Sequence, residues 1–520
     1  MPDVVIVGAG HNGLVAATLL ARAGLAVEVL EAAEVIGGAC RTERPFRKAP
    51  ELSASTGAYL LGLMPPELLS TLDLDLPLVR RDPHYFLPTL DGRHLLLGGD
   101  REQARRLFAE FFSEADARAD EALADEIGAL RDDLGPAWLT EPLDVEATAE
   151  RYIRPALRQV FIELVRGSAM DYLERFGFAA ELVVAMYAVT DGMPGLTGSP
   201  WSPGSGHNFL VHNMCRLPGS GGTWMAVRGG MGTVTQALAA AASAAGATIR
   251  CACPVASITV SDGAAAGVVT YPGQAIPAGV VLCSTDAFRI PGLLGGHAPA
   301  DLVERVALWT ERSPGQTMKV NLATSGLPRF AALPERRGQH GTTVHLLPPP
   351  APDGSVLTAL RQAFDAAAEG RLDAAPPLEW YLHSDLDPSM RDAAGNHSSA
   401  LFVQGVPHEP AGSSWPDEKP AYVDRLLDIV ESYAPGTRES LVDVDALTPP
   451  EIREHFGISS ANIHHVDNAI SFTDRMPYAV GVDGVYAGAA GCFPAGSVIG
   501  CAGHNAARRI LADLGVANTA

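Results

Sequence analysis

Four residues near the N-terminus have types and spacings suited to binding a dinucleotide. Gly8, Gly10 and Gly13 form a G-x-G-x-x-G pattern, and Glu31 lies 18 residues beyond the last of them. Such glycines let the backbone turn tightly and approach a pyrophosphate, whose charge is stabilised at a helix N-terminus. The carboxylate is placed to accept hydrogen bonds from ribose hydroxyls. An acid here favours a free 2′-hydroxyl, and therefore FAD or NAD over NADP.

The surrounding segment predicts the elements that position these residues. Residues 4–7 are apolar and β-branched, which is typical of a buried parallel strand. Residues 14–23 predict a helix, and residues 25–30 predict a second strand that ends at Glu31. A glycine pattern alone also occurs in ordinary turns. The order strand, turn, helix, strand instead predicts a Rossmann-like nucleotide-binding unit.

Two further segments bear on the choice of cofactor. Gly37, Gly38 and Arg41 resemble the second FAD-contacting motif of the amine oxidase and phytoene desaturase superfamily, the alternative being a glycine loop with a solvated arginine. At residues 484–511 a predicted strand enters a glycine-dense loop that leads into a helix. Loop N–H groups and the helix dipole there would stabilise the negative charge of a reduced flavin. The alternative is a structural C-terminal helix. We therefore expect FAD.

Composition limits the class of protein and its partners. The 520 residues include 38 basic and 60 acidic side chains, a formal net charge of −22, which disfavours nucleic acid and anionic lipid as partners. The chain is long enough for two or more domains. No apolar stretch reaches a membrane-spanning length, and the first residues do not resemble a signal peptide. We expect a cytoplasmic protein, while peripheral membrane contact and the oligomeric state stay open.

The cysteines and histidines predict no metal site. There are seven cysteines and no C-x-x-C pair, which argues against a disulfide framework, a zinc site or a dithiol redox centre. His207 and His212 have no metal-ligand spacing to a nearby acid or thiol. A histidine in such a segment is more often a hydrogen-bonded structural residue than a catalytic one.

Several motifs, spread in order along nearly the whole chain, support a family resemblance. They are Val7–Leu14, Gly37–Ala39, Gly229–Gly232, Lys319–Leu322 and Gly500–Ala507. Together they resemble the phytoene desaturase-like FAD-dependent oxidoreductases, and within them the branch of the pyridine nucleotide-disulphide oxidoreductase domain-containing protein 2 type. Disulphide chemistry is not expected here, because the redox C-x-x-C is missing.

The resemblance implies an α/β fold with a Rossmann-like FAD-binding domain of the amine oxidase type and a discontinuous α+β substrate domain. The FAD domain would comprise residues 1–75, 218–300 and 466–520, and the substrate domain residues 76–217 and 301–465. Val255 would border the adenine, and residues 496–500 would meet the isoalloxazine. The full set of expected FAD-binding residues is Gly8, Gly10, Gly13, Glu31, Gly37, Gly38, Arg41, Gly230, Met231, Val255, Gly491, Gly496, Val498 and Ile499.

The resemblance further implies a dehydrogenase or desaturase. Hydride would pass from a substrate C–H to flavin N5, forming a double bond in a small, apolar organic or natural-product substrate. An electron acceptor such as oxygen, a quinone or another carrier would then reoxidise the flavin. The alternatives are an amine or amino-acid oxidase, a reduced-flavin double-bond isomerase, and an FAD-stabilised scaffold protein.

No residue pair identifies itself as catalytic acid and base. Residues 53–61 either line a pocket beside the flavin or form a packed turn. The pocket candidates are Tyr59, His207, His212 and Trp224.

Overall fold

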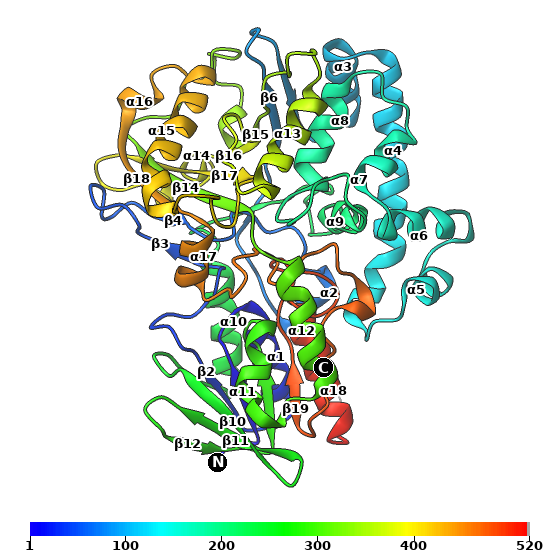
Figure 1. The fold of residues 1–520 in the computed structure, drawn as a ribbon, viewed down its shortest axis with the longest axis vertical. Coiled ribbons are helices and arrows are strands. Elements are labelled where there is room, and N and C mark those ends of the chain that lie inside the picture. The colour runs from blue at the N-terminus through cyan, green and yellow to red at the C-terminus, as the bar shows by residue number, and fades with distance from the viewer. Residues whose placement is uncertain (517–520) are drawn as a thin grey trace.

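The computed structural model describes residues 1–516, and two sheets organise it (Figure 1). The first has five strands in the order β19-β13-β1-β2-β9, and the second has seven in the order β18-β14-β17-β16-β15-β6-β7. The five are β1 Val4–Val7, β2 Val27–Leu30, β9 Thr248–Arg250, β13 Val280–Cys283 and β19 Val485–Ala487. The seven are β6 Tyr85–Pro88, β7 His94–Leu97, β14 Thr317–Thr324, β15 Thr343–Leu346, β16 Leu378–Tyr381, β17 His397–Gln404 and β18 Leu441–Leu447.

The five-stranded sheet is parallel and built from three distant parts of the chain. Strand β1 lies between β2 and β13, with Val4 opposite both Val27 and Val280. All four residues of β1 are buried, as expected for a parallel strand covered on both faces. Helices α1 (His11–Arg22), α10 (Gly232–Ala244) and α18 (Cys501–Asp513) accompany this sheet in the lower half of Figure 1. The predicted Rossmann-like unit is confirmed.

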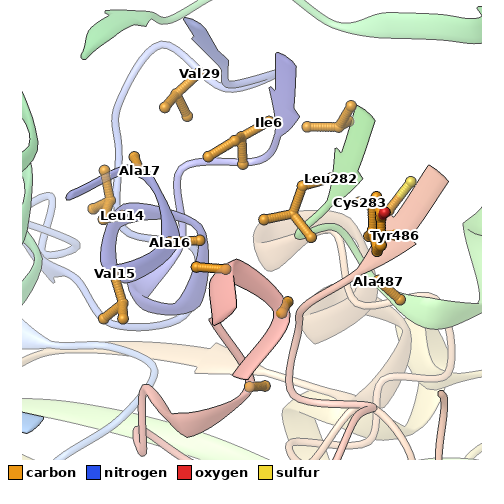
Figure 2. Packing of buried hydrophobic residues seen from close by; sticks show 14 of the residues in the cluster. Ile6, Leu14, Val15, Ala16, Ala17, Val29, Leu282, Cys283, Tyr486 and Ala487 are labelled. Carbon is orange, nitrogen blue, oxygen red and sulfur yellow. The ribbon is translucent and has the colours of Figure 1, made fainter. Parts of the chain in front are cut away.

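Small side chains let the first helix approach this sheet and its neighbouring helices closely. Ala16 and Ala17 of α1 are fully buried, and Figure 2 shows them with Leu14 and Val15 near Ile6 and Leu282. Gly503 of α18 packs against the backbone of α1, because a Cβ at Gly503 would lie 1.9 Å from the Asn12 carbonyl oxygen. The glycine-rich turn before α1 is therefore held between the sheet and the C-terminal helix.

The seven-stranded sheet forms the core of the upper half of the molecule (Figure 1). Its strands are antiparallel, except that β15 pairs in parallel with β6. Strands β6 and β7 form an antiparallel hairpin around Asp91-Gly92. The helices of this half include α3 Arg101–Phe111, α4 Glu114–Leu134, α5 Val145–Tyr152, α6 Arg158–Arg166, α7 Ala169–Glu174, α8 Glu181–Tyr187, α9 Ser205–His212, α13 Val356–Ala368, α14 His383–Leu386, α15 Trp415–Tyr433 and α16 Thr437–Ser440.

Smaller elements connect and extend the two halves. A three-stranded sheet contains β10 Val255–Ser261, β11 Ala264–Thr270 and β12 Ala275–Pro277, and two ribbons pair β3 Thr42–Glu43 with β4 Ala54–Ser55 and β5 Leu78–Val79 with β8 Ala226–Val227. The remaining helices are α2 Pro66–Leu72, α11 Ile290–Leu294, α12 Ala300–Arg312 and α17 Pro449–Phe456. Short helical turns, seven of 3-10 type and one of π type, are Gly135–Leu139, Pro155–Leu157, Ala188–Gly192, Ala287–Arg289, Gly295–His297, Gln339–Gly341, Pro388–Met390 and Phe472–Asp474.

The domain boundaries stay a prediction, although the sheets are informative about them. All strands of the five-stranded sheet fall within the three segments expected to bind FAD. Helix α12 begins at the expected boundary at residue 300, and its Leu302 and Trp309 pack in the same core cluster as that sheet. Among residues 1–516, no helix is both long enough and apolar enough to cross a membrane.

Candidate functional site

One cavity of about 650 Å³ is lined by residues from both halves of the molecule. The five-stranded sheet contributes the glycine-rich turn after β1 and Glu31 after β2. The seven-stranded sheet contributes Lys319, Glu379 and Phe402. Because parallel strands of a doubly wound sheet present their carboxyl ends at one edge, this is where such a fold binds its ligand.

The glycine-rich turn has the shape that a pyrophosphate requires. A Cβ at Gly13 would lie 2.3 Å from the Gly8 carbonyl oxygen, so this glycine is needed for the turn itself. A Cβ at Gly10 would meet no atom within 4 Å, although Gly10 lines the cavity. Because Gly10 has no side chain, the space in front of α1 stays open for a ligand. The first N–H groups of the helix, which have no partner within the helix, face this space.

The end of the cavity near Glu31 has the groups that an adenosine requires. The carboxylate accepts hydrogen bonds from the N–H groups of Ala9 (2.7 Å) and Ala33 (2.9 Å), and its oxygens keep further acceptor capacity for ribose hydroxyls. Cys253 donates its N–H to the Glu31 carbonyl, which brings the following residues, including Val255, to the same end. Tyr271 also lines this end and is 66% exposed.

Unpartnered polar atoms mark the middle of the cavity. His11 Nε2, Ser284 Oγ and His465 Nδ1 are buried and have no hydrogen-bond partner among residues 1–516, and all three residues line the cavity. Burial lowers the pKa of His11 to about 4, assisted by nearby His465. Buried polar groups without a partner are rare, and they fit a site built to be completed by a polar ligand. The residues present therefore fit FAD.

The C-terminal glycine-rich loop reaches the cavity through part of its length. Ala489, Ala490, Ser497 and Val498 line it. Arg475 is 1% exposed and holds the loop by donating to the carbonyls of Ala490 (2.7 Å) and Cys492 (3.0 Å), among other acceptors.

The expected FAD-binding residues divide into two groups. Those that line the cavity are Gly8, Gly10, Glu31, Gly37, Gly38, Val255 and Val498. Those that do not are Gly13, Arg41, Gly230, Met231, Gly491, Gly496 and Ile499. Arg41 instead donates to the His455 carbonyl at 2.9 Å. Gly496 packs on His464, and Met231 donates its N–H to Ser55 Oγ at 3.1 Å.

Three of the four pocket candidates line the cavity. Tyr59 lies between Lys319 and Tyr381, and its hydroxyl is buried without a partner among the described residues. His212 stacks on Trp224, with ring centroids 5.3 Å apart, and burial lowers the pKa of His212 to about 3. His207 lies outside the lining, where its Nδ1 is 2.7 Å from the Asn468 carbonyl. Residues 57–60 of the segment 53–61 line the cavity.

Sequence reasoning missed a row of side chains across the seven-stranded sheet, of which three are polar and one is aromatic. The register places Lys319 of β14 opposite Phe402 of β17, Phe402 opposite Glu379 of β16, and Glu379 opposite His345 of β15. Directly opposed residues lie on the same face of a sheet. All four line the cavity. A detectable signal did exist, because Lys319 and Glu379 are each the single charged residue of a buried strand.

Lys319 is buried beside aromatic rings. Its Nζ donates to the Gly57 carbonyl at 2.7 Å and lies 4.2 Å from the Tyr59 ring centroid and 5.0 Å from that of Phe402. Burial lowers the pKa of Lys319 to about 7, although the carboxyl of Glu379 opposes this shift. The amine can therefore gain or lose a proton near neutral pH.

Two carboxyl groups face the same region. Glu379 accepts hydrogen bonds from Tyr381 and, at 2.8 Å, from Gln404 Nε2. Burial raises the pKa of Glu379 to about 8 and that of Asp191 to about 7. Both carboxyl groups are thus substantially protonated at neutral pH. Among residues 1–516, no group of three or more His, Cys, Asp or Glu side chains is placed to hold a metal ion.

Comparison with protein families identifies this architecture. Residues 13–290, more than half of the chain, match the family of flavin containing amine oxidoreductases. The chain belongs to this family. It is an FAD-dependent oxidoreductase, and the expected FAD cofactor and the expected fold class are confirmed.

Individual members of the family support this assignment. Pyridine nucleotide-disulfide oxidoreductase domain-containing protein 2 of Rattus norvegicus is 33% identical, with 98% of this chain and 94% of that protein covered. A hydroxyneurosporene desaturase of Cereibacter sphaeroides is 30% identical over 58% of this chain and 60% of its own length. A solved structure of putrescine oxidase carrying A394C has the same fold, with a TM-score of 0.59, 18% identity and coverage of 99% of this chain and 98% of that one.

Proposed function

We propose that this flavoprotein is a dehydrogenase or desaturase that forms a double bond in a small organic substrate. When bound, FAD supplies a two-electron acceptor for hydride at N5, and oxygen, a quinone or another carrier would receive the electrons afterwards. The observation that carries the proposal is Lys319, a buried amine that titrates near neutral pH in a cavity shared by both sheets. The resemblance to the phytoene desaturase-like proteins and the similarity to a hydroxyneurosporene desaturase support it.

Lys319 is suited to accept the proton that must leave with the hydride. Formation of a carbon–carbon double bond removes one hydride and one proton from adjacent atoms. In its neutral form, the Lys319 amine has a free lone pair within the cavity, while its N–H donation to the Gly57 carbonyl keeps it oriented. The Tyr59 and Phe402 rings exclude water around the amine, which keeps its pKa low.

The same arrangement disfavours the amine oxidase alternative. An aromatic cage for a substrate ammonium requires free ring faces. Here the chain's own Lys319 occupies one face of Tyr59 and one face of Phe402. A substrate ammonium would also meet like charge whenever Lys319 is protonated.

We further propose that residues 1–75, 218–300 and 466–520 form the FAD domain and that the remainder forms the substrate domain. Within the FAD domain, Gly8, Gly10 and Glu31 would hold the ADP half of FAD. Val255 would border its adenine, because Glu31 and Val255 line the same end of the cavity.

An anaerobic absorbance titration tests the function. The purified holoenzyme is mixed with alkenes, alcohols, carboxylic acids and amines, and bleaching of the oxidised flavin is followed at each addition. We expect a non-amine compound to bleach the flavin and to yield a product with one more double bond. Bleaching by amines alone would support the oxidase. A double-bond shift catalysed only by pre-reduced enzyme would support the isomerase, and a flavin that no compound affects would support the scaffold.

A further inference from the structure

A buried arginine lines the cavity without a carboxylate partner. Arg81 is 5% exposed, and among residues 1–516 no Asp or Glu oxygen lies within 4.0 Å of its guanidinium. Burying an unpaired charge is costly, so buried arginines are usually found in ion pairs. The Arg81 side chain therefore needs either a compensating anion or an unusual number of neutral acceptors.

The neutral acceptors around Arg81 satisfy only part of the guanidinium. Nε donates to the Trp224 carbonyl at 2.9 Å, and Nη1 donates to Thr343 Oγ1 at 2.8 Å and to the His84 carbonyl at 3.3 Å. Nη2 makes no hydrogen bond within residues 1–516. Three acceptors from three separate segments hold the group rigidly, while the two N–H groups of Nη2 stay available.

Nearby groups do not supply the missing charge. The charge of Glu379 acts on Arg81, but the Glu379 oxygens accept hydrogen bonds from Tyr381 and Gln404 instead. Burial raises the pKa of Glu379 to about 8 and that of Asp191 to about 7, so neither is fully ionised at neutral pH. Arg81 keeps its charge, because burial lowers its pKa only to about 10.

We infer that Arg81 binds a carboxylate of the substrate. This inference rests on the proposed function, because it assigns the substrate class of the same cavity. One fixed positive charge with two free N–H groups on Nη2 suits a carboxylate, which carries one negative charge, better than a phosphate dianion. The unpartnered hydroxyls of Tyr59 and Tyr85 line the same cavity and can donate to further substrate oxygens. The substrate is therefore an organic acid with a bond that can be dehydrogenated, rather than a plain hydrocarbon.

Binding of paired acids and amides tests the inference. Decanoate, benzoate, decanamide, benzamide and octyl phosphate are titrated into the holoenzyme, and dissociation constants are read from the flavin absorbance and, independently, from the shift in melting temperature. We expect each acid to bind at least tenfold more tightly than its amide. Equal affinity of acid and amide, no binding by either, or tighter binding of octyl phosphate than of decanoate would overturn the assignment.

Variants locate the site. Arg81→Met is expected to weaken acid binding at least tenfold and to leave amide binding unchanged, whereas Arg81→Lys should recover part of the loss. The adjacent Arg80 is exposed, so Arg80→Met is the matched control and should bind acids as the parent does. Unchanged acid binding in Arg81→Met would contradict the inference. If Arg81→Met fails to fold, the comparison of acid with amide in the unaltered protein decides the inference. Flavin that never bleaches in the substrate titration would count against the proposed function alone.

Discussion

At the scale of single residues, burial determines the chemistry of this cavity. Lys319, Glu379 and Asp191 all titrate near neutral pH because each lies in surroundings that disfavour its charged form. Several titratable groups with shifted pKa values in one cavity are typical of active sites. Their neighbours in sequence are ordinary strand and turn residues. The pKa shifts therefore arise from the burial that the fold imposes.

Replacing Lys319 tests its role as the proton acceptor. Lys319→Met should slow flavin reduction by the best substrate about 10²–10⁴-fold, the usual contribution of a positioned base. In the parent enzyme, the reduction rate should rise with pH through about 7, because only the neutral amine accepts a proton. Stopped-flow reduction from pH 6 to 9 measures both effects.

Two further variants separate a base from a positive charge. Lys319→Arg keeps the charge but does not deprotonate, so it should be as slow as Lys319→Met and lack the rise with pH. Lys48 is exposed, and Lys48→Gln should reduce at the parent rate. A fast Lys319→Arg enzyme would show that only the charge matters.

Glu379 should make stability depend on pH. Its folded pKa of about 8 exceeds the ordinary 4.5, so its contribution is fully present below pH 4.5 and is lost as pH rises through 8. Lys319 acts in the opposite direction, since its stabilising contribution is lost as pH falls through about 7. Between pH 5 and pH 7 Glu379 alone should lower the free energy of unfolding by on the order of 1–3 kcal/mol, at about 1.4 kcal/mol per pKa unit. Buried histidines such as His11 and His212, whose pKa values are lowered, act in the opposite direction, so urea unfolding of the parent is compared with that of a Glu379 variant.

The Glu379→Gln variant should lack this contribution, because an amide does not ionise, so from pH 5 to pH 7 its free energy of unfolding should rise relative to that of the parent by the same amount, on the order of 1–3 kcal/mol at about 1.4 kcal/mol per pKa unit. The contributions of Asp191 and of the buried histidines are present in both proteins and cancel in this comparison. Glu110 is exposed, and Glu110→Gln serves as the control that keeps the parent slope. An unchanged slope in Glu379→Gln would place the titration on another group.

At the scale of elements, two glycines of one turn have different tasks. Gly13→Ala would press a Cβ to 2.3 Å from the Gly8 carbonyl oxygen and 2.9 Å from Ser284 Oγ, so it should lower both stability and FAD content. Gly10→Ala meets no protein atom within 4 Å, so the apoprotein should melt at the parent temperature and yet bind FAD at least tenfold more weakly.

Thermal melting of the apoproteins and titration with FAD distinguish these outcomes. Gly292 of α11 is exposed and has free space for a Cβ, so Gly292→Ala is the control for a harmless change. Full FAD affinity in Gly10→Ala would show that the cofactor does not approach this turn.

At the scale of the whole molecule, the cavity couples the two sheets. Because its lining comes from both, FAD should stabilise them together. At a free FAD concentration 100 times the dissociation constant, the free energy of unfolding should increase by about 2.7 kcal/mol. Calorimetry of the apoprotein with increasing FAD should show the whole melting profile move upward. Two separate melting transitions, of which only one shifts with FAD, would contradict coupling of the two sheets through the cavity.

Sequence alone predicted the nucleotide-binding unit at residues 4–31 well, for a local reason. Residues 4–31 contain a complete strand, turn, helix and strand, so contacts close in sequence determine their structure. His207 illustrates the limit. Its residue type made it a pocket candidate, but α9 directs it to the Asn468 carbonyl, outside the cavity lining.

The substrate side of the cavity was decided by tertiary structure alone. Lys319, Glu379 and His345 are up to 60 residues apart in sequence, and only the register of β14, β17, β16 and β15 places them in one row. Arg81 looks in sequence like its exposed neighbour Arg80, and only long-range packing buries it. The sequence determined that a nucleotide would bind, because that motif is local. The fold determined which side chains meet the substrate, because strand pairing and burial join distant segments.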